Sequence, residues 1–292
     1  MNLEELIYPP DKKKKLKDFD PGYTGKFESK EEAIEKLKKS AVKLSALQDL
    51  LYAHDKYSVL LIFQAMDAAG KDGTIKSVMY GVNPQGCQVK SFKTPSAEEL
   101  DHDFLWRSMK ALPERGNIGI FNRSYYEEVL ITKIHPEILN FQKLPNLSKE
   151  PLKDKKFWEN RYTDINTFEK YLTNNGTVVL KFFLNVSKED QKQRFLDRIN
   201  DPTKNWKFTM NDIRERQYWD KYMEAYEDIL RETSTEYAPW YVIPANKKWF
   251  MRTAVSSIII STLESLNLTY PDLGEAQKKE LLNAKAMLEN EK

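Results

Sequence analysis

The chain has 292 residues, of which 40 % are hydrophobic and 31 % charged, and its formal net charge is only +2. This balance argues against a nucleic-acid-binding protein, because no overall positive field is present and any anion site needs locally placed lysine and arginine. Its single cysteine, Cys87, cannot form an intramolecular disulfide, and the acidic N-terminus is unlike a signal peptide. No apolar stretch is long enough to span a bilayer, so we expect a cytoplasmic protein with no membrane partner.

The first 54 residues are predicted to form an N-terminal arm and one amphipathic helix. Residues 1–29 contain several prolines and glycines and the lysine run Lys12–Lys15, which is typical of irregular structure. The lysine run could bind an anionic polymer, but a solvated tail is the commoner fate of such a run. Residues 31–53 carry apolar side chains at helical spacing, which predicts a helix packed on the core.

Short apolar strands then alternate with helical segments over residues 55–270, the predicted core. The strands are expected at residues 58–64, 86–92, 118–121, 178–184 and 240–243, with a last core helix at 246–266. This order predicts an α/β fold in which five parallel strands lie between two layers of helices. Residues 271–292 are expected to form a separate C-terminal helix. In such sheets, ligands bind beyond the carboxyl ends of the strands.

The segment from Ser58 to Ile75, SVLLIFQAMDAAGKDGTI, carries the strongest functional signal. A buried strand stops at a turn of small residues with Gly70 and Lys71, and helical periodicity follows. Backbone N–H groups, the helix dipole and the lysine together favour a bound phosphate. The segment departs from the standard phosphate-loop motif, because Ala65 replaces its first glycine and Asp72 its Ser/Thr. The sequence still predicts a phosphate substrate and phosphoryl transfer.

Asp67, just before this turn, has two interpretations. It can cap the following helix, or it can hold Mg²⁺ directly or through water. We favour the metal interpretation, since a carboxylate beside bound phosphate is repulsive unless a cation lies between them.

A second cluster follows the third strand, with Asn122, Arg123, Glu127 and Glu128. Arg123 can bind phosphate oxygens with both arms of its guanidinium, whereas Asn122 is a weaker metal ligand than the acid common at such strand ends. The two glutamates either act at the site or only favour the dipole of their helix, and composition does not discriminate between these interpretations.

The third cluster lies in residues 187–234, which are predicted to form a helical lid. Arg194 and Arg198 are four residues apart and share one helix face, and Lys207 follows. Inward-facing arginines suit a lid that closes over phosphate and excludes water. An exposed helix with ordinary ion pairs is an equally good interpretation of this cluster alone.

With these clusters identified, the chain closely resembles the polyphosphate kinase 2 family over residues 23–266. The resemblance rests on five segments in order: FQAMDAAGKDGTIKSVM (63–79), GVNPQGCQVKSFKTPS (81–96), ELDHDFLWR (99–107), IFNRSYYEEVL (120–130) and RINDPTKNWKF (198–208). It implies a phosphate-loop kinase-like core similar to that of nucleoside monophosphate kinases, with a helical lid. It also implies inorganic polyphosphate as the donor, an adenine or guanine nucleotide as the acceptor, and a homo-oligomer, either dimer or tetramer.

The resemblance also implies roles for individual residues. Asp67, Lys71 and Arg123 match catalytic positions. The residues expected to bind polyphosphate are Ala69, Gly70, Lys71, Asp72, Gly73, Thr74, Arg123, Arg194, Arg198 and Lys207. Those expected to bind the nucleotide are Asn83, Gln85, Gly86, Lys93, Thr94, Asp103, Arg107, Asn122 and Glu127. Asp67, Asn122 and Glu127 are the expected ligands of Mg²⁺, or of Mn²⁺ in its place.

Asn122 is a departure, because many family members have Asp at this position. Asn122 with Glu127 downstream resembles the subgroup that phosphorylates both AMP and ADP, and this change leaves open which carboxylate completes the metal shell. Two alternatives remain at this stage: a nucleoside monophosphate kinase that uses ATP as donor, and a non-catalytic phosphate-loop protein that senses nucleotides.

Overall fold

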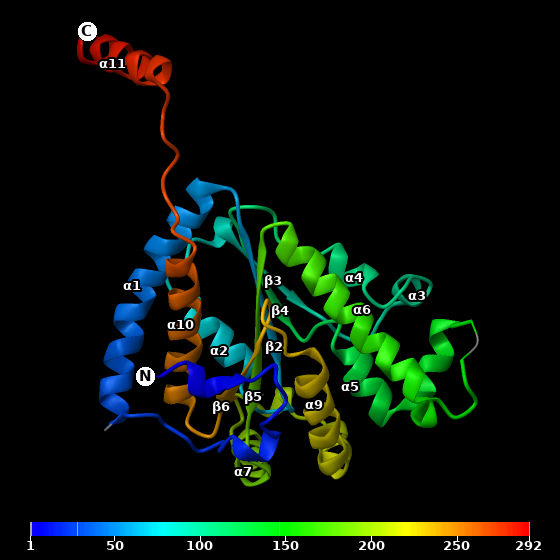
Figure 1. Ribbon diagram of the computed structural model, residues 1–292. Coiled ribbons are helices and arrows are strands. Elements are labelled where there is room, and N and C mark those ends of the chain that lie inside the picture. Colours follow the sequence, from blue (N-terminus) through cyan, green and yellow to red (C-terminus); the bar gives the residue numbers. More distant parts are fainter. Residues whose placement is uncertain (1, 28, 146, 292) are drawn as a thin grey trace.

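The computed structural model describes residues 2–27, 29–145 and 147–291. Met1 and Glu28 of the predicted N-terminal region, and Lys292 of the predicted C-terminal helix, lie outside the described residues. A six-stranded sheet with the order β1-β6-β5-β2-β4-β3 lies between two layers of helices (Figure 1). The predicted three-layer α/β fold is thereby confirmed.

Five of the strands are parallel and lie where the sequence predicts them. They are β2 (Ser58–Gln64), β3 (Cys87–Ser91), β4 (Ile118–Asn122), β5 (Thr177–Asn185) and β6 (Trp240–Pro244). Central strand β2 pairs with β4 on one side and β5 on the other, so that Val59 lies opposite both Ile118 and Val178. Every residue of β2 is buried, because helices cover both faces of the sheet. The unbroken apolar run in the sequence is the signature of this position.

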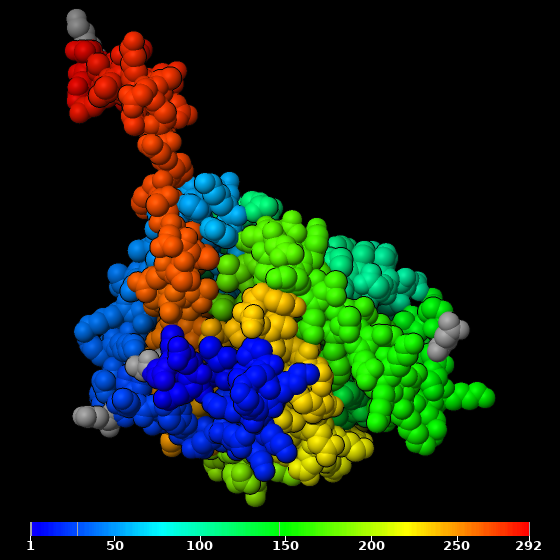
Figure 2. Space-filling model, in the orientation of Figure 1, coloured from blue at the N-terminus to red at the C-terminus, as the bar shows by residue number. Residues whose placement is uncertain are grey.

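The sixth strand corrects the prediction that the N-terminal arm is irregular. Strand β1 (Ile7–Tyr8) pairs antiparallel with β6, and two 3₁₀ turns flank it, η1 (Glu4–Leu6) and η2 (Leu16–Asp18). Tyr8 is buried, and Lys12 forms an ion pair with Glu232 at 2.8 Å. Figure 2 shows the arm lying flat on the body of the molecule. A strand of two residues is too short to produce a periodic pattern, which is why the sequence did not indicate it.

The helices separate into two layers, one on each face of the sheet (Figure 1). One layer contains α1 (Lys30–His54), α2 (Lys71–Val78) and α10 (Lys248–Ser265), and α10 contacts both of the others. The other layer contains α5 (Glu127–Ile134), α6 (Lys155–Asn174) and α9 (Trp219–Thr233), which contact one another. Shorter elements connect them: η3 (Pro84–Gly86), α3 (Ala97–Leu100), α4 (Trp106–Met109), η4 (Pro136–Gln142) and η5 (Pro151–Lys153).

The predicted lid segment is helical in the structure. It comprises α7 (Lys188–Asn200), η6 (Asn205–Lys207), α8 (Met210–Gln217) and α9. The C-terminal helix α11 (Glu275–Glu289) stands away from the body at the end of an extended segment (Figures 1 and 2). The division of the chain into arm, core and C-terminal helix stays a prediction. Among the described residues, no helix combines the length and apolar character needed to cross a lipid bilayer.

Candidate active site

The loop after β2 and the turn after β4 meet at the carboxyl end of the sheet. Arg123 donates from Nη2 to Oδ1 of Asp67 at 3.1 Å, and Asn122 donates from Nδ2 to Oδ1 of Asp72 at 2.7 Å. Because β2 and β4 are adjacent and parallel, the residues that follow them are brought together. The two clusters singled out in the sequence therefore form one site.

The loop itself has the backbone of a phosphate cradle. Ala68 and Gly70 adopt left-handed conformations, with φ of +60° and +109°, and Gly70 is the N-cap of α2. A Cβ at position 70 would also lie 3.2 Å from Met251 Cε, so both the backbone conformation and the available space favour glycine here. Thr74 is buried and donates its hydroxyl to the Gly70 carbonyl at 2.9 Å. The side chain of Thr74 therefore serves the helix, and within the loop the amide of Ala69 donates to the carbonyl of Met66 at 3.2 Å.

Lys71 is the first residue of α2 and lies inside the site. Its Nζ donates to the carbonyl of Ala65 at 2.8 Å, across the mouth of the loop. Burial lowers the pKa of Lys71 below its ordinary value, while the nearby carboxylate of Asp67 opposes this effect. Lys71 is half-buried, and its ammonium can interact with a polyanion bound at the loop.

Helix α7 of the lid segment holds the carbonyl groups of the loop. Arg194 donates from Nη1 to the carbonyls of Ala69 at 2.6 Å and Ala68 at 3.1 Å, and Gln191 donates to that of Asp67 at 2.9 Å. The second arm of Arg194 reaches the carbonyls of Ala245 and Asn246, after β6. Three successive loop carbonyls thus face α7.

The side chain of Arg194 is buried and bonded to backbone carbonyls, a role that the sequence does not predict. Its contact with polyphosphate stays a prediction. The other predicted lid cations lie over aromatic rings, Arg198 over Phe195 at 5.7 Å and Lys207 over Trp206 at 4.9 Å. Lys207 is exposed and Arg198 half-buried, so both remain accessible to a polyanion.

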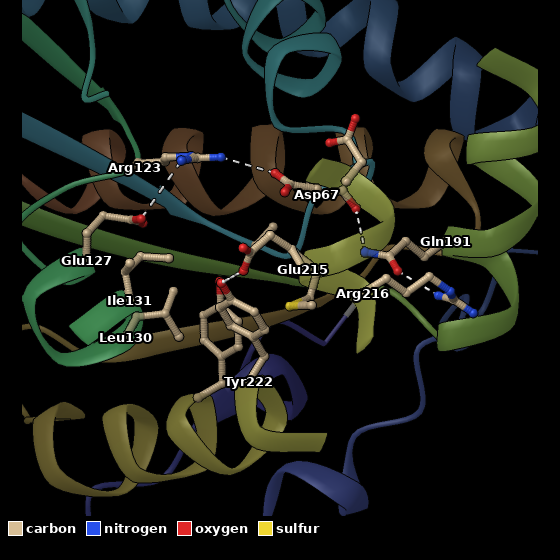
Figure 3. Close-up of a pocket in the computed structure, with 13 residues that line it drawn as sticks. Asp67, Arg123, Glu127, Leu130, Ile131, Gln191, Glu215, Arg216 and Tyr222 are labelled. Carbon is tan, nitrogen blue, oxygen red and sulfur yellow. Dashed lines mark hydrogen bonds and ion pairs between the residues drawn. The ribbon is translucent and has the colours of Figure 1, made fainter. Parts of the chain in front are cut away.

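A pocket opens between the strand ends and the lid segment (Figure 3). Its polar walls come from Asp67, Arg123, Glu127, Gln191, Asp212, Glu215, Arg216 and Tyr222. Arg123 has a φ of +62° and lies between two carboxylates, that of Asp67 and that of Glu127, whose Oε2 is 4.0 Å from Nη1. Burial raises the pKa of Glu127, and the cations Arg123 and Lys71 oppose the rise. One arginine thus connects two acids at the entrance of the loop.

Five of these polar pocket residues were missed by sequence reasoning: Gln191, Asp212, Glu215, Arg216 and Tyr222. Arg216 donates to Gln191 Oε1 at 2.6 Å, and Tyr222 donates to Glu215 Oε2 at 2.7 Å (Figure 3). Gln191 precedes Arg194 by three residues, so helical spacing placed it on the same face. The three charged residues of α8 had no signal, because nothing local distinguishes them from ordinary helix residues, and the buried Tyr222 resembles a core aromatic residue.

The predicted nucleotide residues divide into an exposed group and a packed one. Lys93 and Thr94 are exposed just after β3, at the end of the sheet that carries Arg123, and Arg107 donates to the carbonyl of Lys93 at 2.8 Å. Asn83 and Gln85 are exposed just before β3, at the opposite end of this strand, so the structure does not bring them to the Arg123 turn. Asp103 accepts a hydrogen bond from the amide of Leu105 at 2.9 Å. Arg107 also lines a second hollow that reaches Ser124, next to Arg123 in the chain.

Gly86 belongs to the packed group and has a structural explanation. A Cβ at this position would lie 1.8 Å from Nε2 of Gln48 on α1. Gly86 is buried, so the close approach of η3 to α1 accounts for the glycine.

The carboxylates present can hold a divalent cation only with help from a substrate. The described part of the chain has no group of three or more His, Cys, Asp or Glu side chains placed to bind a metal. Asp67 and Glu127 do line one pocket. Mg²⁺ is commonly held by one or two carboxylates, several waters and substrate phosphates, and this donor set fits that pattern. Asn122 donates its amide NH₂ to Asp72, which leaves its Oδ1 as the atom that could bind a metal, and its predicted role as a ligand stays a prediction.

Residues 27–270 match the family model described as Polyphosphate kinase 2 (PPK2). The chain is 55 % identical over 262 residues to an ADP-polyphosphate phosphotransferase of Rhodopseudomonas palustris, covering 90 % of each chain. It is 46 % identical over 278 residues to an AMP/ADP-polyphosphate phosphotransferase of Meiothermus ruber, covering 95 % of this chain and 98 % of that one. A crystal structure of polyphosphate kinase 2 from Arthrobacter aurescens TC1 superposes with a TM-score of 0.86 at 40 % identity, covering 96 % of both chains.

Proposed function

The chain belongs to the polyphosphate kinase 2 family, as its five motifs indicated, and on this premise we propose that it transfers the terminal phosphoryl group of inorganic polyphosphate to ADP and to AMP. One observation supports the proposal above the others. Lys71, Asp67 and Arg123 meet at one end of the sheet, beside a loop whose backbone can cradle phosphate. This is the arrangement that phosphoryl transfer needs, since the protein must position phosphates and stabilise charge rather than form covalent bonds.

Each of these residues then has a distinct task. The amides of the loop and the ammonium of Lys71 bind the terminal phosphates of the donor. Arg123 lines the pocket, with one arm toward Asp67 and the other toward Glu127, and stabilises the charge that develops on the transferring group. Asp67, with Glu127 nearby, would hold Mg²⁺, which when bound neutralises phosphate oxygens. The lid segment limits the access of water, so that transfer is favoured over hydrolysis.

The acceptor would lie on the β4 side of Arg123. Asn122 at the end of β4 is uncharged and bonded to Asp72, so the acceptor side of the site carries one negative charge fewer than an aspartate would give. A smaller repulsion between protein and nucleotide phosphates is compatible with both AMP and ADP. We extend the proposal to guanine nucleotides, to a homo-oligomeric assembly and to a cytoplasmic location, which the sequence predicts.

The decisive assay is ATP formation from AMP with polyphosphate as the sole phosphoryl donor, in the presence of Mg²⁺. We expect ADP to appear first and ATP to follow, and we expect the Lys71→Met variant to be inactive while remaining folded. A nucleoside monophosphate kinase would require ATP and form nothing from polyphosphate. A nucleotide-sensing protein would bind nucleotide without turnover, and either result would overturn the proposal.

A further inference from the structure

A buried network of charged and polar side chains lies directly behind the site. Lys181 on β5 and Glu169 on α6 are both 0 % exposed, and their Nζ and Oε2 atoms are 2.6 Å apart. The ammonium also donates to the hydroxyl of Tyr126 at 3.0 Å and to the carbonyl of Thr233 at 2.7 Å. Its three protons therefore have three acceptors.

The carboxylate of Glu169 is equally well satisfied. Its Oε1 accepts hydrogen bonds from the hydroxyl groups of Tyr125 at 2.8 Å and Tyr126 at 2.7 Å. Burial lowers the pKa of Lys181, and the carboxylate of Glu169 opposes this effect. Replacing a buried ion pair by apolar residues of similar volume is often neutral or stabilising, so stability alone does not account for such a pair. Its directional bonds, in contrast, fix the positions of the groups that it joins.

Those groups are parts of the active site. Tyr125 and Tyr126 lie in the chain between Arg123 and Glu127, the two residues that form an ion pair in the pocket. The turn between them is further held by Ser124, whose Oγ accepts hydrogen bonds from Gln64 at 3.1 Å and from the Tyr126 amide at 3.2 Å. Arg123 itself has a left-handed backbone, which a non-glycine residue keeps only when its surroundings hold it.

The network also reaches the lid segment. Thr233 is the last residue of α9, and this helix carries Tyr222 and Tyr226 into the same pocket. The hydroxyl of Thr233 accepts a hydrogen bond from Trp240 Nε1 at 2.9 Å, which fastens the end of α9 to β6. One ammonium group therefore joins the turn that carries Arg123 to the fixed end of the lid segment.

We propose that Lys181 and Glu169 are positioning residues for phosphoryl transfer, which act through Tyr125 and Tyr126 to hold Arg123 in its reactive orientation. The inference rests on the proposed function. It predicts a loss of turnover without a matching loss of substrate affinity, because the network touches the residues that contact substrate and not the substrate itself.

The test removes hydroxyl groups and leaves the rings in place. The double variant Tyr125→Phe/Tyr126→Phe takes away both hydroxyl donors to Oε1 of Glu169, and also the Tyr126 hydroxyl that accepts from Lys181. The matched control is Tyr162→Phe on α6, because the Tyr162 hydroxyl is buried and has no hydrogen-bond partner within residues 2–27, 29–145 and 147–291. We expect the double variant to lose roughly tenfold or more in kcat, since small misplacements of a catalytic group have effects of this size, with KM for polyphosphate and ADP within about twofold of wild type. The control should retain wild-type kcat.

A mutant cycle with Arg123→Lys separates positioning from a merely structural role. If the tyrosines act through Arg123, removing their hydroxyl groups from the Arg123→Lys protein should reduce kcat much less than in the wild-type background. Equal losses in both backgrounds, or a double variant as active as the Tyr162→Phe control, would overturn the inference. Should the double variant not fold, the single Tyr125→Phe variant takes its place in the cycle. A wild-type protein that forms no ATP from polyphosphate would instead contradict the proposed function, so the two failures are distinguishable.

Discussion

Arg194 donates a hydrogen bond to the carbonyl of Ala69 at 2.6 Å, and this bond ties the first helix of the lid segment to the phosphate loop. The other arm of the same guanidinium reaches the segment after β6. A single side chain thus joins the segments that follow β2 and β6, the two strands on either side of β5, and the loop carbonyls face α7. We therefore expect Arg194 to shape the site, whereas the sequence alone suggested contact with phosphate.

The first prediction concerns this arginine. Arg194→Lys should lower kcat roughly tenfold or more, because a lysine ammonium cannot bond to both segments that the two arms of the guanidinium reach. It should also lower the free energy of unfolding by about 1–3 kcal/mol, because buried carbonyl groups lose their hydrogen-bond donors. Steady-state kinetics and urea unfolding provide the two measurements. Arg214→Lys is the control, since this arginine of α8 is exposed and does not line the pocket. If Arg194 instead binds polyphosphate, the lysine variant should keep its stability and show only a higher KM.

The contrast between Gly70 and Arg194 shows how far sequence reasoning extends. A glycine before a lysine, after an apolar strand, is a local pattern with a local cause, and the loop was predicted from it correctly. The bonds of Arg194 run to backbone carbonyls of residues 68, 69, 245 and 246, and a backbone carbonyl is identical in every residue. No sequence pattern therefore predicts which carbonyl groups Arg194 binds. The same holds for Gly86, whose neighbour Gln48 lies 38 positions away in the chain.

The second prediction concerns pH and Lys71. Burial lowers the pKa of this ammonium in the free protein, and a bound polyanion should raise it again. The profile of kcat/KM, which reports the free enzyme, should therefore fall on the alkaline side at a lower pH than the profile of kcat, which reports the complex.

Lys71→Arg is the informative control for this titration. A guanidinium stays protonated throughout, so whatever activity this variant retains should lose the alkaline limb that Lys71 causes. Identical alkaline limbs in the two proteins, or in the two wild-type profiles, would show that another group is responsible.

The third prediction tests the metal ligand. Asp67→Asn should reduce kcat roughly 10²-fold, as is typical when one electrostatic contact is lost from a pre-organised site. It should also raise the Mg²⁺ concentration that gives half-maximal rate, since an amide is a weaker ligand than a carboxylate. Titration of the rate with Mg²⁺, and with Mn²⁺ in its place, measures this shift.

Asp49→Asn, on the exposed face of α1, is the control for a lost negative charge. A Mg²⁺ titration of Asp67→Asn that matches wild type would remove Asp67 from the metal site.

The fourth prediction distinguishes packing from nucleotide contact at Gly86. A methyl group there meets Gln48, so Gly86→Ala should lower the free energy of unfolding by about 1–3 kcal/mol, as overpacking in a well-filled core does. Gln48→Ala removes the obstacle at small cost, because Oε1 of Gln48 has no partner within the described residues. In the Gln48→Ala background, Gly86→Ala should therefore lower the free energy of unfolding much less. Thermal or urea unfolding of wild type, the two single variants and the double variant measures this coupling.

Gly274→Ala, with open space around its Cβ, is the control and should change stability by no more than about 0.5 kcal/mol. A direct role in nucleotide binding has a different signature, since KM for AMP or ADP would then rise with Gly86→Ala even where Gln48 is already alanine.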